Sequence, residues 1–294
     1  MCRWVAYLGN AVSPQELLYE PEHSLIQQSK YSKLYEEGVN GDGFGLAWYG
    51  KHGTPGIYRN TAPAWSDRNL REICAQVEAE IFIAHVRATT GTPVQQTNCH
   101  PFRYGRWIFV HNGYLDAYER VRRELLMAVD PSLFMNIEGT TDSELLFHLA
   151  LTFGLEREPL LALERMAGFV EAVGERHGIA EPLQMTLGVS DGQQVYAVRY
   201  ASGPIVNSLY VSASVDAVRA LYPERERLQH VPPNARAIVS EPLIHLPGAW
   251  LEVPVSTALI VRHSSIESIP FMPIEPDRTY VSSSVMHRLE QIDR

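Results

Sequence analysis

The sequence opens with MCRWVAYLG, residues 1–9, which places a thiol directly behind the start methionine. The apolar run at residues 4–8 predicts a β-strand at the very start of the fold. Removal of Met1 would leave Cys2 with a side-chain sulfur and a free α-amine, so that one residue carries both a nucleophile and a base. An N-terminal cysteine can equally be an exposed chain end without chemistry. The rest of the chain therefore has to supply the partners that a catalytic cysteine needs.

Length and composition indicate an ordinary globular protein. The chain has 294 residues, room for one large domain or two small ones, with 45% hydrophobic and 20% charged residues. Its net charge of -9 disfavours binding to phosphate backbones, so no nucleic-acid partner is expected. No apolar run approaches the roughly 20 residues that span a bilayer, and the N-terminus lacks the apolar core of a secretory signal. These features predict a soluble, cytoplasmic protein without membrane association.

The cysteines and histidines give no sign of a disulfide framework or a metal centre. There are 3 cysteines, an odd and low number that suits a reducing compartment. They are Cys2, Cys74 and Cys99. No pair has the CxxC spacing of a structural zinc site, and His85, His100 and His111 match no standard ligand pattern. We therefore expect no metal and no cofactor.

Cys74 and Cys99 are weaker candidates for a nucleophile than Cys2. Cys74 lies on the apolar face of a predicted helix, which is typical of a core cysteine. Cys99 is followed by His100, but neighbours on an extended chain point in opposite directions. A Cys99–His100 dyad is therefore disfavoured.

The pattern along the chain runs from strands to helices and back to strands. Strands are predicted at residues 4–8, 44–49, 57–59, 81–86 and 107–111, and again at 184–190, 194–199, 208–213, 235–240, 250–253 and 258–261. Helices are predicted at residues 25–30, after Ser66 or Asp67, at 117–129, after Thr141 or Asp142, at 160–177 and at 284–291. The remainder of 11–41 and the segment 89–105 are predicted to be irregular. With no repeat and no clear linker, this order predicts one α+β domain with layered sheets.

Three polar segments lie at strand ends or helix starts, where they can face a cleft. Arg87 directly follows a predicted strand; its planar guanidinium suits a carboxylate, although a lone arginine is more often a surface residue paired with an acid. Asn112 and Gly113 end the next strand, and their amide and backbone N–H groups suit an oxyanion hole, although an Asn-Gly pair alone also fits a turn. Asp142 either caps a helix or, with Thr141 as the cap, accepts from an ammonium group.

Taken together with Cys2, these segments form a consistent set: a nucleophile, a carboxylate binder, an ammonium binder and an oxyanion hole. A ligand with an α-carboxylate, an α-ammonium and a side-chain carbonyl would satisfy all of them. Glutamine or a γ-glutamyl amide has that description.

The segments MCR, GDGFGLA, AHVRATTG, NCHPF, HNG and TDSE stand in this order along the chain. In order and spacing they resemble the class II glutamine amidotransferases, N-terminal-nucleophile hydrolases with a cysteine at the mature N-terminus. The resemblance runs from Cys2 to about Phe271. It implies a class II glutamine amidotransferase domain at 2–271 with a C-terminal tail at 272–294. It also implies a four-layer αββα sandwich of two antiparallel sheets between helices.

The resemblance implies catalytic roles for three residues. Cys2 would be the nucleophile, provided that Met1 is removed. Its own α-amine would be the general base, since an α-amine titrates near about 8. Asn112 and Gly113 would stabilise the tetrahedral oxyanion.

The resemblance also implies the substrate contacts. Arg87 would hold the α-carboxylate and Asp142 the α-ammonium. Thr90 would be a further contact, although Gly91 comes four residues after Arg87 where the family commonly has five.

The expected function is hydrolysis of the side-chain amide of glutamine or of a γ-glutamyl amide, through a γ-glutamyl thioester on Cys2. The chain is similar to stand-alone family members such as the γ-glutamyl hydrolases of the ergothioneine pathway, because residues 272–294 are too few for a fused synthase. Two alternatives stay open: a glutaminase subunit that supplies ammonia to a separate synthase partner, and a non-catalytic glutamine-binding sensor.

Overall fold

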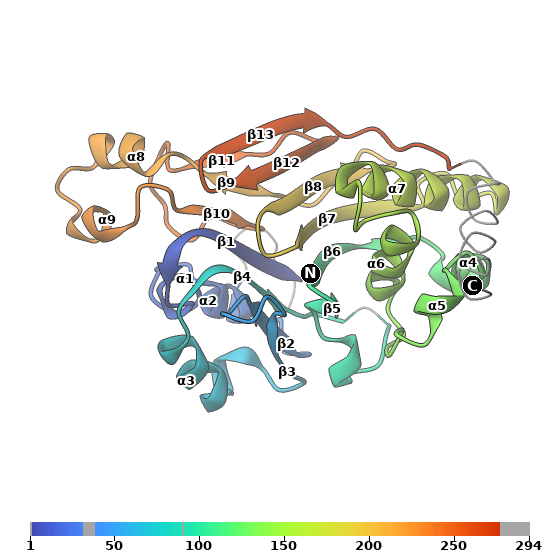
Figure 1. Ribbon diagram of the computed structural model, residues 1–294, viewed down its shortest axis with the longest axis horizontal. Helices are drawn as coiled ribbons and strands as arrows, with labels where there is room; N and C mark the ends of the chain where they lie inside the picture. The colour runs from blue at the N-terminus through green and yellow to red at the C-terminus, as the bar shows by residue number, and fades with distance from the viewer. Residues whose placement is uncertain (1, 32–38, 90, 277–294) are drawn as a thin grey trace, which may run out of the picture.

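The computed structural model describes residues 2–31, 39–89 and 91–276 of the chain. Within these ranges two antiparallel sheets are stacked between two sets of helices (Figure 1). This arrangement confirms the predicted α+β class and its four layers.

Sheet A carries the N-terminal strand at its centre, in the order β11-β9-β10-β1-β4-β2-β3. Its strands are β1 (Arg3–Val12), β2 (Phe44–Trp48), β3 (Gly56–Asn60), β4 (Ala79–Val86), β9 (Tyr210–Ser212), β10 (Arg236–Val239) and β11 (Trp250–Glu252). β1 is longer than predicted because it continues across a register shift between Leu8 and Val12. Antiparallel pairing with β4 on one edge and β10 on the other holds the first residues of the chain inside the sheet.

Sheet B has the order β13-β12-β8-β7-β6-β5. Its strands are β5 (Phe102–Tyr104), β6 (Trp107–Leu115), β7 (Leu183–Ser190), β8 (Val195–Ala201), β12 (Thr257–Arg262) and β13 (Ser265–Pro270). β6 runs past its predicted end at residue 111, because β7 pairs with it as far as Leu115. β5 falls in a segment that was predicted to be irregular. β13 was not predicted, since its mostly exposed edge carries no apolar pattern.

The helices cover the outer faces of the two sheets. They are α1 (Gln15–Leu18), α2 (Leu25–Lys30), α3 (Arg68–Gln76), α4 (Tyr118–Met127), α5 (Pro131–Phe134), α6 (Asp142–Thr152), α7 (Pro159–Arg176), α8 (Val215–Leu221) and α9 (Glu226–His230), with 3-10 turns at Ala64–Ser66 and Gln96–Asn98. Asp67 caps α3 and Thr141 caps α6, each accepting a hydrogen bond from a backbone N–H in the first turn, which decides the two alternatives left by the sequence. α1, α5, α8 and α9 were not predicted, and the helix predicted at 284–291 lies outside the described residues.

Alternation along the strands divides the interior into three apolar clusters. On β1, Val5 and Tyr7 face the α1–α3 layer, while Trp4 and Ala6 face the other sheet. On β6, Phe109 packs with α6 and α7, while Ile108 and Val110 pack between the sheets. Because side chains alternate along a strand, Cys2 and Trp4, on either side of Arg3, lie on the same face of sheet A, the face that packs against the other sheet. Cys2 therefore belongs to the space between the sheets.

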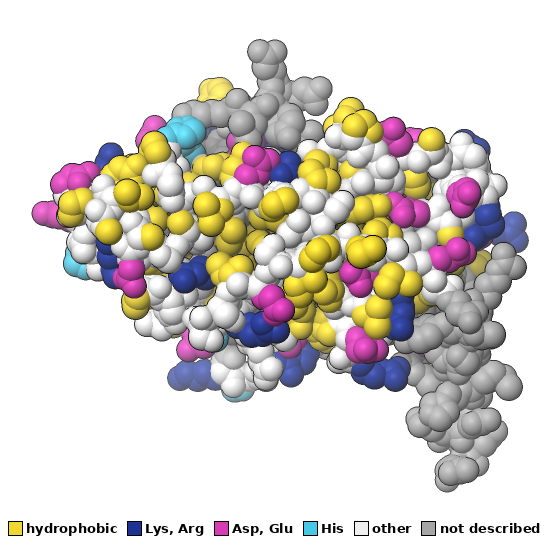
Figure 2. Space-filling view, turned by 90° about the horizontal axis from the view of Figure 1, so that it is seen from above, with side chains coloured by type: hydrophobic (Ala, Val, Ile, Leu, Met, Phe, Trp, Pro, Cys, Tyr) yellow, Lys and Arg dark blue, Asp and Glu magenta, His cyan; other side chains and the backbone are white. Residues whose placement is uncertain are grey.

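The outer surface carries no membrane-spanning element among the described residues: none of their helices is long and apolar enough to cross a bilayer. Seen from the side of β12 and β13, hydrophobic side chains are interspersed with charged ones (Figure 2). The domain boundary predicted after Phe271 stays a prediction. Phe271 itself is buried, and the backbone N–H groups of Met272 and Ile274 still donate to Glu164 on α7.

Candidate active site

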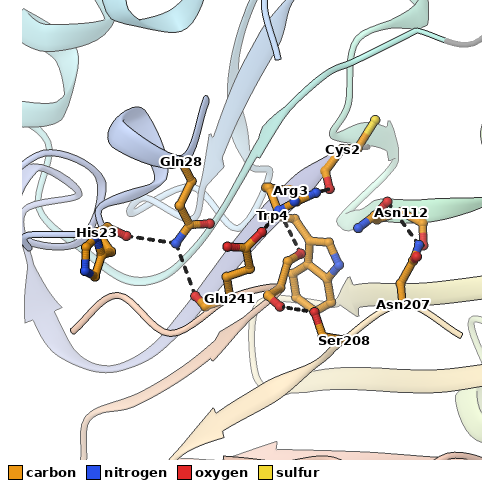
Figure 3. A network of polar contacts seen from close by, with 10 residues as sticks. Cys2, Arg3, Trp4, His23, Gln28, Asn112, Asn207, Ser208 and Glu241 are labelled. Atoms are coloured by element: carbon orange, nitrogen blue, oxygen red, sulfur yellow. Dashed lines mark hydrogen bonds and ion pairs between the residues drawn. The ribbon is translucent and has the colours of Figure 1, made fainter. Parts of the chain in front are cut away.

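A buried chain of polar contacts anchors the N-terminus. Arg3 is fully buried and forms an ion pair with Glu241, and its Nη1 donates to the carbonyl oxygen of Cys2 at 2.8 Å. Gln28 Nε2 donates to the backbone oxygens of Glu241 at 3.2 Å and His23 at 2.8 Å. Figure 3 shows these contacts running from His23 to Cys2. Arg3, which holds the Cys2 carbonyl, is therefore itself held by Glu241, 238 positions further along the sequence.

Cys2 is the one partly exposed cysteine among the three, since Cys74 and Cys99 are buried. Its Sγ lies 3.4 Å from both the backbone nitrogen and the backbone oxygen of Ala88. Burial of the sulfur raises the pKa of the Cys2 thiol, against the lowering effects of the Ala88 backbone hydrogen bond and of Arg87. A thiol with a raised pKa is protonated at neutral pH, so its use as a nucleophile requires a base.

The loop before β2 folds onto the end of β4 and holds Arg87 beside Cys2. The backbone nitrogen of Arg87 donates to Gly43 at 2.8 Å, and the carboxylate of Asp42 accepts from the backbone nitrogen of Thr89 at 2.9 Å. Gly43 has φ +118, and a Cβ there would lie 2.5 Å from Cys99 Sγ, so this close turn needs glycine.

Arg87 is 3% exposed, and its guanidinium is oriented by hydroxyl groups. Its Nη2 donates to Thr92 Oγ1 at 2.6 Å and to Thr89 Oγ1 at 3.2 Å, and its Nη1 donates to the Asp42 carbonyl at 3.3 Å. The structure thus places Arg87 inside the fold rather than in an ion pair on the surface. Thr90 lies outside the described residues.

Asn112 and Gly113 lie within β6, not in a turn. Both the carbonyl oxygen and the side-chain Oδ1 of Asn112 accept from Nδ2 of the buried Asn207, at 3.1 and 3.3 Å. Because Oδ1 is used in this way, the amide NH₂ of Asn112 is the group left to donate elsewhere. A Cβ on Gly113 would lie 1.9 Å from the Gln184 carbonyl oxygen, so glycine is needed here for a close approach of β7 and not for a left-handed backbone.

Asp142 is half-buried at the start of α6, next to the end of β6. With Thr141 acting as the N-cap, the Asp142 carboxylate accepts from the backbone nitrogen of Leu115 at 3.0 Å and from that of Ser143 at 2.7 Å. The capping alternative for Asp142 is therefore wrong. The carboxylate is fixed to the end of β6, the strand that also carries Asn112.

Two buried histidines, His85 and His100, lie close to Arg87. The rings of His85 and His100 stack with centroids 4.2 Å apart, and none of their four nitrogens has a hydrogen-bond partner in the described part of the chain. Burial lowers the pKa of His85 to about 3 and that of His100 well below its usual range, so both are neutral. Within the described residues, no group of three or more His, Cys, Asp or Glu side chains could hold a metal ion.

Reasoning from the sequence did not identify the residues that orient the proposed site residues. Asp42 lies in the quoted GDGFGLA segment but received no role, and Thr92 was not singled out. Asn207 carries no local signal at all, because only the packing of its loop against β6 brings it to Asn112. The structure brings Cys2 and Arg87 together through Ala88.

A four-layer fold whose central strand places a cysteine at its N-terminal end between two antiparallel sheets is that of an N-terminal-nucleophile hydrolase. The profile of the family described as "Glutamine amidotransferases class-II" matches residues 29–210, more than half of the chain, so the chain belongs to this family and is an enzyme of it. The matched range contains Arg87, Asn112, Gly113 and Asp142 and begins after Cys2.

Several known proteins are similar to this chain. The probable glutamine amidotransferase DUG3 of Saccharomyces cerevisiae is 29% identical over 97% of this chain and 89% of its own. The gamma-glutamyl-hercynylcysteine sulfoxide hydrolase of Mycolicibacterium smegmatis is 30% identical over 53% of this chain and 65% of its own. Among solved structures, a glutamine aminotransferase class-II domain protein from Silicibacter pomeroyi superposes with a TM-score of 0.69 and 30% identity, covering 92% of this chain and 100% of that one.

Proposed function

We propose that the protein hydrolyses the side-chain amide of glutamine or of a γ-glutamyl amide, through a γ-glutamyl thioester on Cys2. The observation that carries the proposal is the partly exposed Cys2, whose Sγ is held at Ala88, next to the buried Arg87 side chain. The two named relatives support the same substrate class, since one is described as a glutamine amidotransferase and the other as a γ-glutamyl hydrolase.

In this mechanism the thiol of Cys2 loses its proton to its own α-amine as Sγ attacks the γ-carbonyl carbon. The amine is exposed as a base only after Met1 is removed. Asn112 Nδ2 and the Gly113 N–H stabilise the oxyanion. The C–N bond then breaks, and the leaving amine takes the proton from the α-ammonium. Water gives a proton to the α-amine as it attacks the thioester carbonyl carbon, the C–S bond breaks, and the Cys2 sulfur takes that proton back as glutamate leaves.

Substrate recognition uses the two ends of the glutamyl group. Arg87 binds the α-carboxylate, with its guanidinium oriented by Thr89 and Thr92. Asp142 binds the α-ammonium, and its attachment to Leu115 fixes the distance to the oxyanion site. Thr90 is proposed as a further contact of the glutamyl group.

The test is glutamate release from glutamine and from a panel of γ-glutamyl amides by wild type and by Cys2→Ala. The variant should lose activity by a factor of about 10³ or more, because no other group can form the acyl intermediate. Cys74→Ala removes a thiol from the outer helical layer and should leave the rate unchanged. Intact-mass measurement should show loss of Met1 and, after rapid quenching, a glutamyl adduct on wild type only. Full activity of Cys2→Ala would rule the mechanism out.

A further inference from the structure

A second polar pocket lies between β3, β5 and the turn that leads into α6. Its volume is about 480 Å³, within the usual range of small-ligand sites. Its polar lining includes Arg59, Arg103, Tyr104, Glu138, Glu144 and His148. Of the described residues proposed for catalysis or glutamyl binding, none lines it.

His148 provides an unused acceptor at this pocket. It is 2% exposed, and its Nδ1 lies 2.9 Å from the carbonyl oxygen of Glu144, which can only accept, so Nδ1 carries the proton. Burial lowers the pKa of His148, which keeps the ring neutral and leaves a lone pair on Nε2. Nε2 is buried and has no hydrogen-bond partner in the described part of the chain. Because His148 lines the pocket, a donor bound there would satisfy this acceptor.

Two guanidinium groups lie at the same pocket, and most of their N–H groups have no partner within the described residues. Arg59 donates to the Cys99 carbonyl at 3.3 Å and lies 3.7 Å from the exposed carboxylate of Glu138. Arg103 is exposed and donates to the Pro55 carbonyl at 3.0 Å. A guanidinium has five donors, so each group retains N–H bonds for an anion.

Glu144 fixes the shape of the pocket and contributes a carboxylate to its lining. Its carboxylate accepts from the backbone nitrogens of Glu138 at 2.9 Å and Gly139 at 2.7 Å, which holds the turn before α6 in place. Burial raises the pKa of Glu144, so a cationic neighbour would stabilise its charged form.

We propose that this pocket binds a small amino-acid or dipeptide zwitterion, with its carboxylate on Arg59 and Arg103 and its ammonium group facing His148 Nε2 and Glu138. The lining balances two guanidinium groups against two carboxylates. This balance favours a net-neutral zwitterion over phosphate or a polyamine, each of which would meet like charges. The site is separate from the glutamyl site and does not depend on the proposed hydrolysis.

Calorimetric titration with alanine and with glycylglycine tests the proposal. Both wild type and Arg87→Ala should bind one molecule per chain, because Arg87 belongs to the other site. Arg103→Ala and His148→Phe should weaken binding about tenfold or more, as expected for loss of a charge-assisted bond or a buried acceptor. Arg106→Ala removes an exposed arginine on the same hairpin outside the pocket and should bind as wild type does. Acetate and methylamine, which each carry half of the zwitterion, should bind much more weakly.

Two results would overturn the proposal. One is the absence of saturable binding by wild type up to about 10 mM of either probe. The other is binding that disappears in Arg87→Ala but persists in Arg103→Ala, which would assign the heat to the glutamyl site. Arg103 is exposed, so its variant should fold even if His148→Phe does not.

Discussion

At the scale of single residues, Asn207 is the side chain that orients Asn112, the proposed oxyanion donor. It donates to both the carbonyl oxygen and Oδ1 of Asn112, so it determines which end of that amide faces outward. We expect Asn207→Ala to lower kcat for glutamate release by about 10- to 100-fold with little change in KM, because oxyanion contacts form only in the transition state. Steady-state kinetics on glutamine measures both constants.

Asn234→Ala is the matched control for this variant. Asn234 is a partly exposed residue bonded to Asn10, so its loss should change neither constant. In the double variant Asn112→Ala/Asn207→Ala, kcat should fall no further than in Asn112→Ala alone, since Asn207 acts through Asn112. An unchanged kcat in Asn207→Ala, or additive losses in the double variant, would contradict the positioning role.

Residue types and local spacing marked Cys2, Arg87 and Thr141 as candidates and left an alternative open for each. They could not predict what surrounds them. An arginine after a strand is the same in sequence whether it lies on the surface or, as here, 3% exposed beneath two threonine hydroxyls. The difference is made by the loop around Asp42, which is far away in sequence and folds across the end of β4.

At the scale of elements, the pairing of β6 with β7 depends on the absence of a side chain at Gly113. A Cβ there would lie 1.9 Å from the Gln184 carbonyl and 2.5 Å from His111 Nε2, so the strands would have to separate. We expect Gly113→Ala to lower the free energy of unfolding by about 1–3 kcal/mol, as for overpacking in a core. Urea denaturation followed by circular dichroism measures this change.

Gly50→Ala is the matched control, because the added Cβ meets no neighbouring atom there. Nothing lies within 4 Å of the Cβ position at Gly50, and its φ is not positive, so the unfolding midpoint should stay near that of wild type. Equal midpoints for Gly113→Ala and wild type would show that β7 can move aside at no cost.

Most element types could be predicted from periodicity, and their ends could not. β6 was predicted to stop at residue 111 because polar His111 and Asn112 follow the apolar run, yet the ladder with β7 continues to Leu115. Hydrogen bonding to a neighbouring strand outweighs side-chain polarity in setting strand length. α8 and α9, which follow β9, were missed altogether.

At the scale of the whole molecule, burying neutral histidines makes the fold sensitive to acid. Burial lowers the pKa of His85, His100, His111 and His148, that of His85 to about 3. Unfolding restores a pKa near about 6.5, so below that pH the unfolded state binds more protons than the folded one. Stability is therefore full above about pH 6.5 and is lost as the pH falls toward the folded-state values.

We expect the free energy of unfolding to be lower at pH 5 than at pH 7, with a contribution of about 2 kcal/mol from His85 alone. Urea titrations at the two pH values measure the difference. His85→Phe should reduce it, whereas replacing the exposed His52 by glutamine should leave it unchanged. The same difference in His85→Phe as in wild type would show that His85 does not contribute.

The order of strands and helices, the balance of charge and the motifs around Cys2 were enough to predict an α+β fold, a class II glutamine amidotransferase and a glutamyl substrate class. These features are local: periodicity reports which face of an element is buried, and a motif reports residue types at fixed spacing. Which side chains orient the site was decided by tertiary contacts, between Glu241 and Arg3, between Asn207 and Asn112, and around Arg87. Such contacts join residues from separate parts of the chain, and their geometry exists only after the two sheets have packed together.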